Sequence, residues 1–173
     1  MGDGGAERLE VCLAAPGDAA VVGDILDDVR WWLSLRGIGQ WTRPFGESWV
    51  AEKIAAGEVF IAWVDGAPVA VVRLLWEDRF FWGERDRGDA GYVHTLAVRR
   101  DRAGQGIGAA LLRWAEEEVR RHGRRLLRLD CAAENQALDA YYQGLGFVAV
   151  GSAAVAGETM MLYEKALTEE EAA

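Results

Sequence analysis

The stretch Val93–Ala109, VHTLAVRRDRAGQGIGA, decides the fold of this chain. It passes from an apolar strand through a charged turn into a helix that begins among glycines. The first N–H groups of a helix have no partner within the helix and carry the positive end of its dipole, so they attract anions. Gly104, Gly106 and Gly108 keep side chains away from that backbone. The stretch therefore predicts a pyrophosphate site at the amides of about residues 104–109.

Two kinds of protein place a pyrophosphate on such a turn. Gly104–Ala109 fits the dinucleotide fingerprint G-x-G-x-x-A, and Asp130 ends the next expected strand, where a ribose-binding acid would lie. In that motif, however, the first glycine follows the strand almost directly, whereas Arg99–Ala103 intervene here. Only 43 residues follow Asp130, too few for the remaining strands of a nucleotide-binding sheet. These two differences argue against a dinucleotide-binding protein.

The stretch resembles the acyl-CoA-binding motif of the GNAT N-acetyltransferase superfamily, in which a strand ends in L-x-V and Q/R-x-x-G-x-G/A opens a helix. Leu96–Val98 and Gly106–Gly108 match this pattern. The first motif position falls on Ala103 instead of Gln or Arg, with Arg102 and Gln105 beside it. The resemblance implies that backbone amides do most of the binding, and it leaves open which side chain touches the phosphates.

A second segment, NQALDAYYQGLGF at 135–147, resembles the GNAT pattern N-x-x-A-x-x-[FY]-Y-x-x-x-G-F. Asn135, Tyr142, Gly146 and Phe147 fall in register, and Ala137 lies near the small residue of the family. This match is independent of the glycine turn. The two together make the resemblance specific, and it covers about residues 9–166.

The resemblance implies a role for each matched residue. The backbone of Leu96–Val98 would hold the pantetheine and the acetyl carbonyl, and a bulge in this strand would expose the N–H that such a contact needs. Asn135 would bond the pantetheine arm, and the Tyr142 hydroxyl would donate a proton to the leaving thiolate. The implied cofactor residues are Leu96, Ala97, Val98, Arg102, Gly104, Gln105, Gly106, Ile107, Gly108, Ala109, Asn135 and Tyr142.

Amine acetylation also needs a base, because only the deprotonated amine is a nucleophile. His94 stands four residues before Val98, where some arylalkylamine-acetylating members carry a working histidine. Asp130 stands five residues before Asn135, where the branch that acetylates ribosomal-protein N-termini carries a working glutamate. Deprotonation through water is the third alternative. Each residue also has a purely structural interpretation: His94 would be a hydrogen-bonded histidine in a strand, and Asp130 would be a carboxylate that caps a turn at the end of a strand.

Aromatic residues suggest where the acceptor binds. Trp31 and Trp41 lie where the first two helices of this family wall the acceptor site, and Phe81 lies in a polar, aromatic segment, Glu77–Asp89, that we expect to be a loop. We predict that these three aromatic residues bind an amine with an apolar or flat body, by stacking or cation–π contact. Core packing is the alternative for each of them.

Composition restricts the class of protein. The 173 residues, 51% apolar and 27% charged, indicate a single globular domain, with residues 1–7 and 168–173 as flexible tails. The net charge of −9 argues against a nucleic-acid partner, and no apolar run is long enough for a membrane span. Cys12 and Cys131 are expected to be buried in strands, and they form neither a metal motif nor a disulfide framework. A reducing, cytoplasmic setting is the default expectation.

Periodicity and turn signals predict the order β-α-α-β-β-β-α-β-α-β-β, with Asp65-Gly66 as a hairpin turn. This is a mixed α/β fold, a sheet of about seven strands flanked by about four helices, and it is also the GNAT order. The chain is therefore expected to be an acyltransferase of the EC 2.3.1 type. It would transfer acetyl from acetyl-CoA, without a metal, to a primary amine by direct attack in a ternary complex. We expect the acceptor to be a small-molecule amine more than a protein. The alternative function is that of a non-catalytic acyl-CoA sensor. The sequence leaves open whether the protein forms a homodimer.

Overall fold

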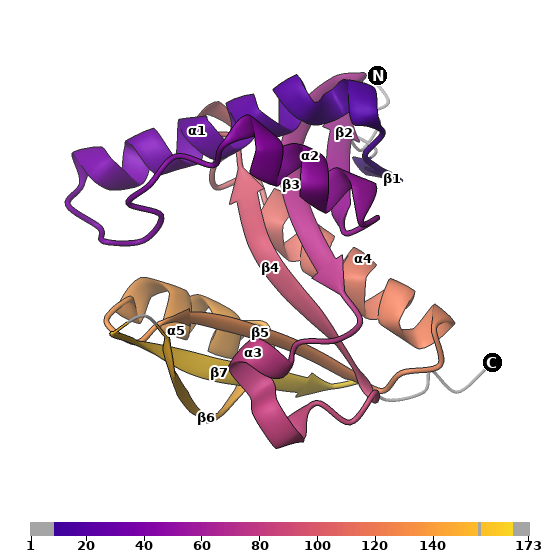
Figure 1. Ribbon diagram of the computed structural model, residues 1–173, viewed down its shortest axis with the longest axis vertical. Coiled ribbons are helices and arrows are strands. Elements are labelled where there is room, and N and C mark those ends of the chain that lie inside the picture. Colours follow the sequence, from indigo (N-terminus) through magenta and orange to yellow (C-terminus); the bar gives the residue numbers. More distant parts are fainter. Residues whose placement is uncertain (1–8, 156, 168–173) are drawn as a thin grey trace, which may run out of the picture. The chain divides into compact units, whose positions relative to one another are not determined.

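The computed structural model describes residues 9–155 and 157–167 (Figure 1). Within these residues, seven strands form one sheet in the order β1-β2-β3-β4-β5-β7-β6. The strands are β1 (Leu9–Leu13), β2 (Val59–Val64), β3 (Ala67–Leu75), β4 (Ala90–Val98), β5 (Leu126–Ala132), β6 (Val148–Val155) and β7 (Glu158–Ala166). The helices are α1 (Ala19–Leu35), α2 (Glu47–Ala55), α3 (Arg79–Trp82), α4 (Ile107–Arg121) and α5 (Gln136–Gly144), with the short 3-10 helices η1 (Pro16–Asp18), η2 (Gly83–Arg85) and η3 (Arg100–Arg102).

The predicted mixed sheet and its element order are confirmed. The pairing of β4 with β5 is parallel, whereas β1–β2, β2–β3, β5–β7 and β6–β7 are antiparallel. One part of the prediction is wrong: the segment Glu77–Asp89, expected to be a loop, contains α3 and η2. Helices this short show no full apolar period, so the sequence pattern does not reveal them. The predicted tails, residues 1–7 and 168–173, lie outside the described residues.

The chain forms two compact units, and each is considered by itself. Unit 1 consists of the segment that ends at Arg73 together with Thr95–Leu112. Unit 2 consists of Leu74–His94 and the segment that begins at Arg113. The boundary passes through β3, β4 and α4, so these three elements contribute to both units. The expectation of a single domain stays a prediction.

The core of unit 1 forms between the helices α1 and α2 and the strands of its part of the sheet. Apolar residues of α1 recur at helical spacing and are buried. They are Val22, Ile25, Leu26, Val29 and Leu33. α2 lies beside α1 (Figure 1) and adds Val50 and Ile54 to the same core. The β2–β3 hairpin turns at Asp65 and Gly66, whose φ angles of 49° and 76° are those of the predicted turn.

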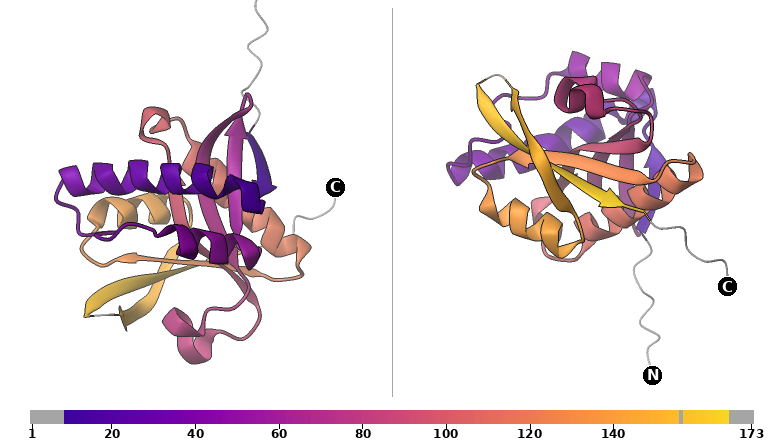
Figure 2. Two further views of the ribbon diagram at one scale, coloured as in Figure 1. Left: turned by 45° about the horizontal axis from the view of Figure 1, so that its top comes forward. Right: turned by 90° about the horizontal axis from the view of Figure 1, so that it is seen from below.

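The core of unit 2 forms around Trp82, Ala90, Tyr92 and Leu162. The whole of β5, from Leu126 to Ala132, pairs with β7. The β6–β7 hairpin is drawn in yellow in Figure 2 (right). Among the described residues, no helix has both the length and the apolar composition needed to cross a membrane.

The two cysteines differ in their exposure to solvent. Cys131 in β5 is buried, as predicted, but Cys12 in β1 is exposed. β1 is the first strand in the order of the sheet, and side chains alternate between its two faces. Leu9 and Val11 are half-buried, whereas Cys12 takes an outward position. The expectation that both thiols are buried is therefore wrong for Cys12.

Candidate functional site

The glycine turn lies in unit 1, between β4 and α4. Gly104 and Gly106 adopt φ angles of 78° and 77°, a region that residues with a Cβ enter at a cost. A helical bond joins the N–H of Ala110 to the carbonyl of Gly106 at 3.0 Å, so the N–H groups from Gly106 to Ala109 precede the first N–H that donates within the helix. A Cβ built on Gly104 or Gly106 would meet no atom within 4 Å, so the backbone is open there. This turn fits a pyrophosphate bound by backbone amides.

Two arginines ahead of the glycines hold this turn in unit 1. The Nε of Arg99 donates to the carbonyl of Pro68 at 2.8 Å, and the backbone N–H of Arg100 donates to Asp28 Oδ2 at 2.8 Å. The Arg100 guanidinium also lies 3.8 Å from the centre of the Trp32 ring, within cation–π distance. These side chains therefore serve the fold of the turn. Sequence patterns did not indicate the contact between Asp28 and Arg100.

The remaining predicted cofactor residues of unit 1 lie around the turn. Arg102 ends η3 and is half-buried, and Gln105 is exposed between the two glycines. Ahead of the turn, Thr95 in β4 has a φ of 51°, which is an outlier for a β-branched residue. This conformation interrupts the extended backbone directly before Leu96–Val98, where a bulge was expected. Strain of this kind is concentrated at functional sites.

Unit 2 contains a cluster of three ionisable side chains. The Nε2 of His94 lies 2.9 Å from Asp78 Oδ2, and its Nδ1 lies 3.3 Å from Asp130 Oδ1. The side chains of His94, Asp78 and Asp130 are only 14%, 5% and 9% exposed. His94 and Asp130, which the sequence offered as alternative bases, therefore belong to one group.

The register of the sheet explains this contact. β4 and β5 pair in parallel from Ala90 with Leu126 up to Val93 with Leu129, and His94 and Asp130 are the next residue on each strand. Burial raises the pKa of Asp130 from the ordinary 3.8 to about 6, against the attraction of His94, while the charge of Asp78 adds to the rise. Asp130 is thus a carboxyl group that exchanges its proton near neutral pH.

Asp78 is the member of the cluster that sequence reasoning missed. It caps α3, since its Oδ1 accepts the N–H of Phe81 at 3.2 Å, and its own N–H donates to Asp86 Oδ2 at 2.8 Å. An aspartate two residues ahead of a short aromatic run, Phe80–Trp82, is a capping signal that could have pointed to it. The ring centre of Phe81 lies 5.4 Å from that of His94, so this predicted substrate residue packs beside the cluster.

A polar network continues from Asp86 through the core of unit 2. The Tyr92 hydroxyl donates to Asp86 Oδ1 at 2.8 Å and accepts from Arg128 Nη1 at 3.0 Å. Arg128 also forms an ion pair with Glu164 at 2.8 Å. Burial, followed by the hydrogen bond to Asp86, raises the pKa of Tyr92 to about 12, so its hydroxyl stays protonated. The segment that carries Asp78 is therefore fixed to β4 and β5 by a continuous set of hydrogen bonds.

The two predicted residues of the second signature lie on α5 and at its start. Asn135 is the N-cap, because its Oδ1 accepts the N–H of Leu138 at 3.1 Å. Tyr142 is buried, and its ring centre lies 5.8 Å from that of Tyr163 and 6.0 Å from that of Phe147. Burial raises the pKa of Tyr142 above its ordinary value of 10. The hydroxyl is therefore protonated at neutral pH and can act as a proton donor.

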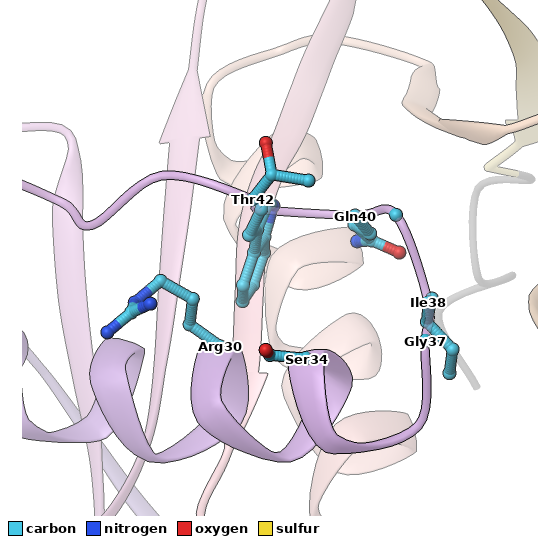
Figure 3. Close-up of a pocket in the computed structure, with 8 residues that line it drawn as sticks. Arg30, Ser34, Gly37, Ile38, Gln40 and Thr42 are labelled. Atoms are coloured by element: carbon cyan, nitrogen blue, oxygen red, sulfur yellow. The ribbon is translucent and has the colours of Figure 1, made fainter.

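A pocket of about 260 Å³ lies in unit 1, between the end of α1 and the connection to α2 (Figure 3). The residues that line it are Arg30, Ser34, Gly37, Ile38, Gly39, Gln40, Trp41 and Thr42. Trp41 has a φ of 56° and packs edge-on against Phe45 at 5.3 Å between ring centres. Trp31, on α1, is 61% exposed and is not among the lining residues. The pocket combines one aromatic ring with several hydrogen-bonding side chains.

Comparisons with known proteins agree with the fold and the motifs. The model of the Acetyltransferase (GNAT) family matches residues 26–147. The uncharacterized N-acetyltransferase YesJ of Bacillus subtilis is 34% identical over 173 residues, which cover 95% of this chain and 94% of YesJ. A GNAT-family acetyltransferase structure from Listeria monocytogenes has a TM-score of 0.80 at 26% identity and covers 92% of this chain and 95% of its own.

A more distant structure, that of yncA from Salmonella typhimurium, was determined with its cofactor acetyl-CoA. It shares the fold at a TM-score of 0.68 and 18% identity, covering 96% of this chain and 98% of its own. The family model spans both signatures, the glycine turn and the segment that begins at Asn135. The chain therefore belongs to the GNAT family of N-acetyltransferases.

Proposed function

We propose that this protein transfers the acetyl group of acetyl-CoA to the primary amine of a small molecule, by direct attack in a ternary complex. The observation that carries the proposal is the contact of His94 with Asp130 in a nearly buried cluster. A sensor that only binds an acyl-CoA needs no base, and burying an ionisable cluster costs stability. The cluster therefore favours the enzyme over the sensor.

The glycine turn supports acetyl-CoA as the donor. The amides from Gly106 to Ala109, which precede the first N–H that donates within α4, and the positive end of that helix would hold the pyrophosphate. The irregular backbone at Thr95 supports the role expected for Leu96–Val98 in orienting the acyl carbonyl. Acetyl-CoA supplies an activated acetyl thioester, so the chain itself needs only to bind, to orient and to move protons.

The proton steps are assigned to unit 2. An ammonium ion must lose a proton before its nitrogen can attack, and the pair of His94 and Asp130 can accept that proton near neutral pH. Tyr142 stays protonated and would donate a proton as the CoA thiol leaves. No covalent intermediate on the enzyme is required.

The pocket of unit 1 supports a small acceptor. Its volume of about 260 Å³ lies just below the range of about 300–1,000 Å³ that is typical of ligand pockets. The Trp41 ring offers a surface for stacking, and Ser34, Gln40 and Thr42 offer polar groups. We therefore propose an amine with a compact, flat body that carries polar substituents.

The test is an assay of acetyl transfer to a panel of primary amines, in which the release of the CoA thiol is measured. The panel includes aryl amines, amino acids and short peptides. We expect release only with acetyl-CoA and a small amine, and Tyr142→Phe should lower kcat with little change in the KM for acetyl-CoA. A protein that is stabilised by acetyl-CoA but releases no thiol with any amine would be the sensor.

The acceptor pocket has its own test. Trp41→Ala should raise the KM for the acceptor and leave the KM for acetyl-CoA unchanged, since a lost stacking contact weakens only one of the two substrates. Leu35→Ala is the matched control, because Leu35 lies on α1, is 71% exposed and does not line the pocket. An acceptor KM that Trp41→Ala does not change would remove this pocket from the acceptor site.

A further inference from the structure

We infer that Asp78 fixes the tautomer and orientation of His94, and that Asp130, at the other ring nitrogen, is the group that takes the proton of the ammonium ion. The inference rests on the proposed function and assigns the members of its base. Asp78 is then a positioning residue, His94 shares the proton, and Asp130 meets the substrate.

The geometry of the histidine ring is the first step. An imidazole has two nitrogens, and here each faces a carboxylate: Nε2 lies 2.9 Å from Asp78 and Nδ1 lies 3.3 Å from Asp130. While both contacts hold, neither nitrogen can reach an ammonium ion. Asp130 differs in this respect, because it faces His94 with Oδ1 and has a second oxygen, Oδ2. A direct role for His94 as the base would require it to leave one of its partners.

The two carboxylates are held differently, which decides the tautomer. Asp78 is anchored twice, by the N–H of Phe81 on its Oδ1 and by the bond from its own N–H to Asp86. Its side chain is 5% exposed, and its Oδ2 is aimed at Nε2 of His94. A neutral imidazole carries one N–H. We assign this proton to Nε2, where it donates to the fixed carboxylate of Asp78, so that Nδ1 presents its lone pair to Asp130.

The proton balance follows from this assignment. The N–H bond of the ammonium ion breaks, an O–H bond forms on Asp130, and the electron pair stays on the amine nitrogen. The amine becomes neutral, and so does the carboxylate. The accepted proton is then shared between Asp130 and the Nδ1 of His94, so the charge that develops on the ring is balanced by Asp78. No further reactant is needed.

The groups around the pair act on Asp130 in opposite directions: burial and the charge of Asp78 raise the pKa of its carboxyl, whereas the charge of His94 lowers it. The charges that bear on Asp130 are those of His94, from β4, and of Asp78, which precedes α3. From α5, Tyr142 lies close enough for the charge of Asp130 to raise its pKa. Burial raises the pKa of Asp130 to about 6, so the carboxyl both ionises and accepts a proton near neutral pH.

The decisive experiment is side-chain ¹⁵N NMR of the histidines in the free protein, which requires no acceptor. The chain has two histidines, His94 and His122. His122 is an internal reference for the opposite tautomer, because its Nδ1 lies 2.9 Å from the carbonyl of Glu118, which can only accept. We expect neutral His94 to carry its proton on Nε2. A proton on Nδ1 would overturn the inference.

Variants sharpen this measurement. In Asp78→Asn, the negative charge beside Nε2 of His94 is lost, so the preference for a proton on Nε2 should weaken and the two tautomers of neutral His94 should mix. Asp89→Asn is the matched control, since Asp89 lies on the same segment but faces Arg125 and Arg128. It should leave the signals of His94 in place. Unchanged signals of His94 in Asp78→Asn would also overturn the inference.

Kinetics separate positioning from a purely structural role. Asp130→Asn should lose about 100-fold or more in kcat, as expected for a lost general base, and Asp78→Asn about tenfold. Because Asp78 acts through His94, Asp78→Asn should cost nothing more in the background of His94→Gln. Additive losses would make Asp78 only a cap of α3, and a larger loss in His94→Gln than in Asp130→Asn would make His94 the direct base.

The proposed function and the assignment of Asp78 and Asp130 can fail separately. If the wild-type protein transfers no acetyl group to any amine, the proposed function fails whatever the NMR shows. If transfer occurs but His94 carries its proton on Nδ1, or if the variant losses add, the proposed function stands and the assignment of Asp78 and Asp130 falls.

Discussion

Asp130→Asn should make this protein more stable at neutral pH although it removes a residue of the base. Burial raises the pKa of Asp130 to about 6 in the folded protein, from 3.8 in an open chain. Below about pH 3, the carboxyl is protonated in both states and folding is unaffected. As the pH rises through 4 to 6, the unfolded chain releases this proton first, so stability is lost. Above about pH 6 the loss is complete.

The structure gives the size of the effect. A rise of about two pH units, at about 1.4 kcal/mol each, is on the order of 3 kcal/mol of unfolding free energy. Asparagine has nearly the same shape, carries no charge at any pH, and can donate from its amide to the Nδ1 of His94. The variant should therefore gain up to about 3 kcal/mol at pH 7.5, or about 6–12 °C in melting temperature, and only a small fraction of that at pH 4.

The assay is thermal and urea unfolding of the wild type and the variant at several pH values between 4 and 8. Asp27→Asn is the control for the loss of a surface carboxylate, because Asp27 is 56% exposed and pairs with Arg30 on its own helix turn. It should change stability by no more than about 0.5 kcal/mol. If Asp130→Asn is less stable than the wild type at pH 7.5, or if its gain does not depend on pH, the reasoning about Asp130 is wrong.

Further predictions concern packing, the glycine turn and the thiols. Gly91→Ala would place a Cβ 2.3 Å from Val119 Cγ2 in a buried strand, so it should cost about 1–3 kcal/mol in urea unfolding, and Val119→Ala should recover part of the loss. Gly106→Ala, at a φ of 77°, should cost about 1–2 kcal/mol and weaken acetyl-CoA binding in calorimetry; unchanged affinity would contradict the amide site. Cys12 should react with a thiol reagent in the native protein, whereas buried Cys131 should react only on unfolding.

Most of the fold could be predicted from local sequence patterns. The glycine turn, the Asp65-Gly66 hairpin and the apolar stripe of α1 each depend on neighbours in sequence, and each could be predicted. α3 could not, because four residues contain barely one helical turn. The prediction that Cys12 is buried was wrong, because a strand pattern does not indicate which face of an edge strand is covered.

The site was predictable only in part. His94 and Asp130 could be named as candidates from the two motifs, but their contact depends on the register of β4 and β5, which no local pattern determines. Asp78 reaches the same histidine from a segment that looked like a loop. The strain at Thr95 likewise arises from the folded strand and not from any feature of its sequence neighbours.

Thermal melting with acetyl-CoA, CoA and NAD in parallel tests directly whether the glycine turn binds an acyl-CoA. A ligand at 100 times its Kd contributes about 2.7 kcal/mol, or about 5–10 °C in a domain of this size. We expect such a rise with acetyl-CoA and CoA, no rise with NAD, and a smaller rise in Gly106→Ala. No rise with either CoA compound, or a rise with NAD alone, would contradict the assignment of the glycine turn as an acyl-CoA site.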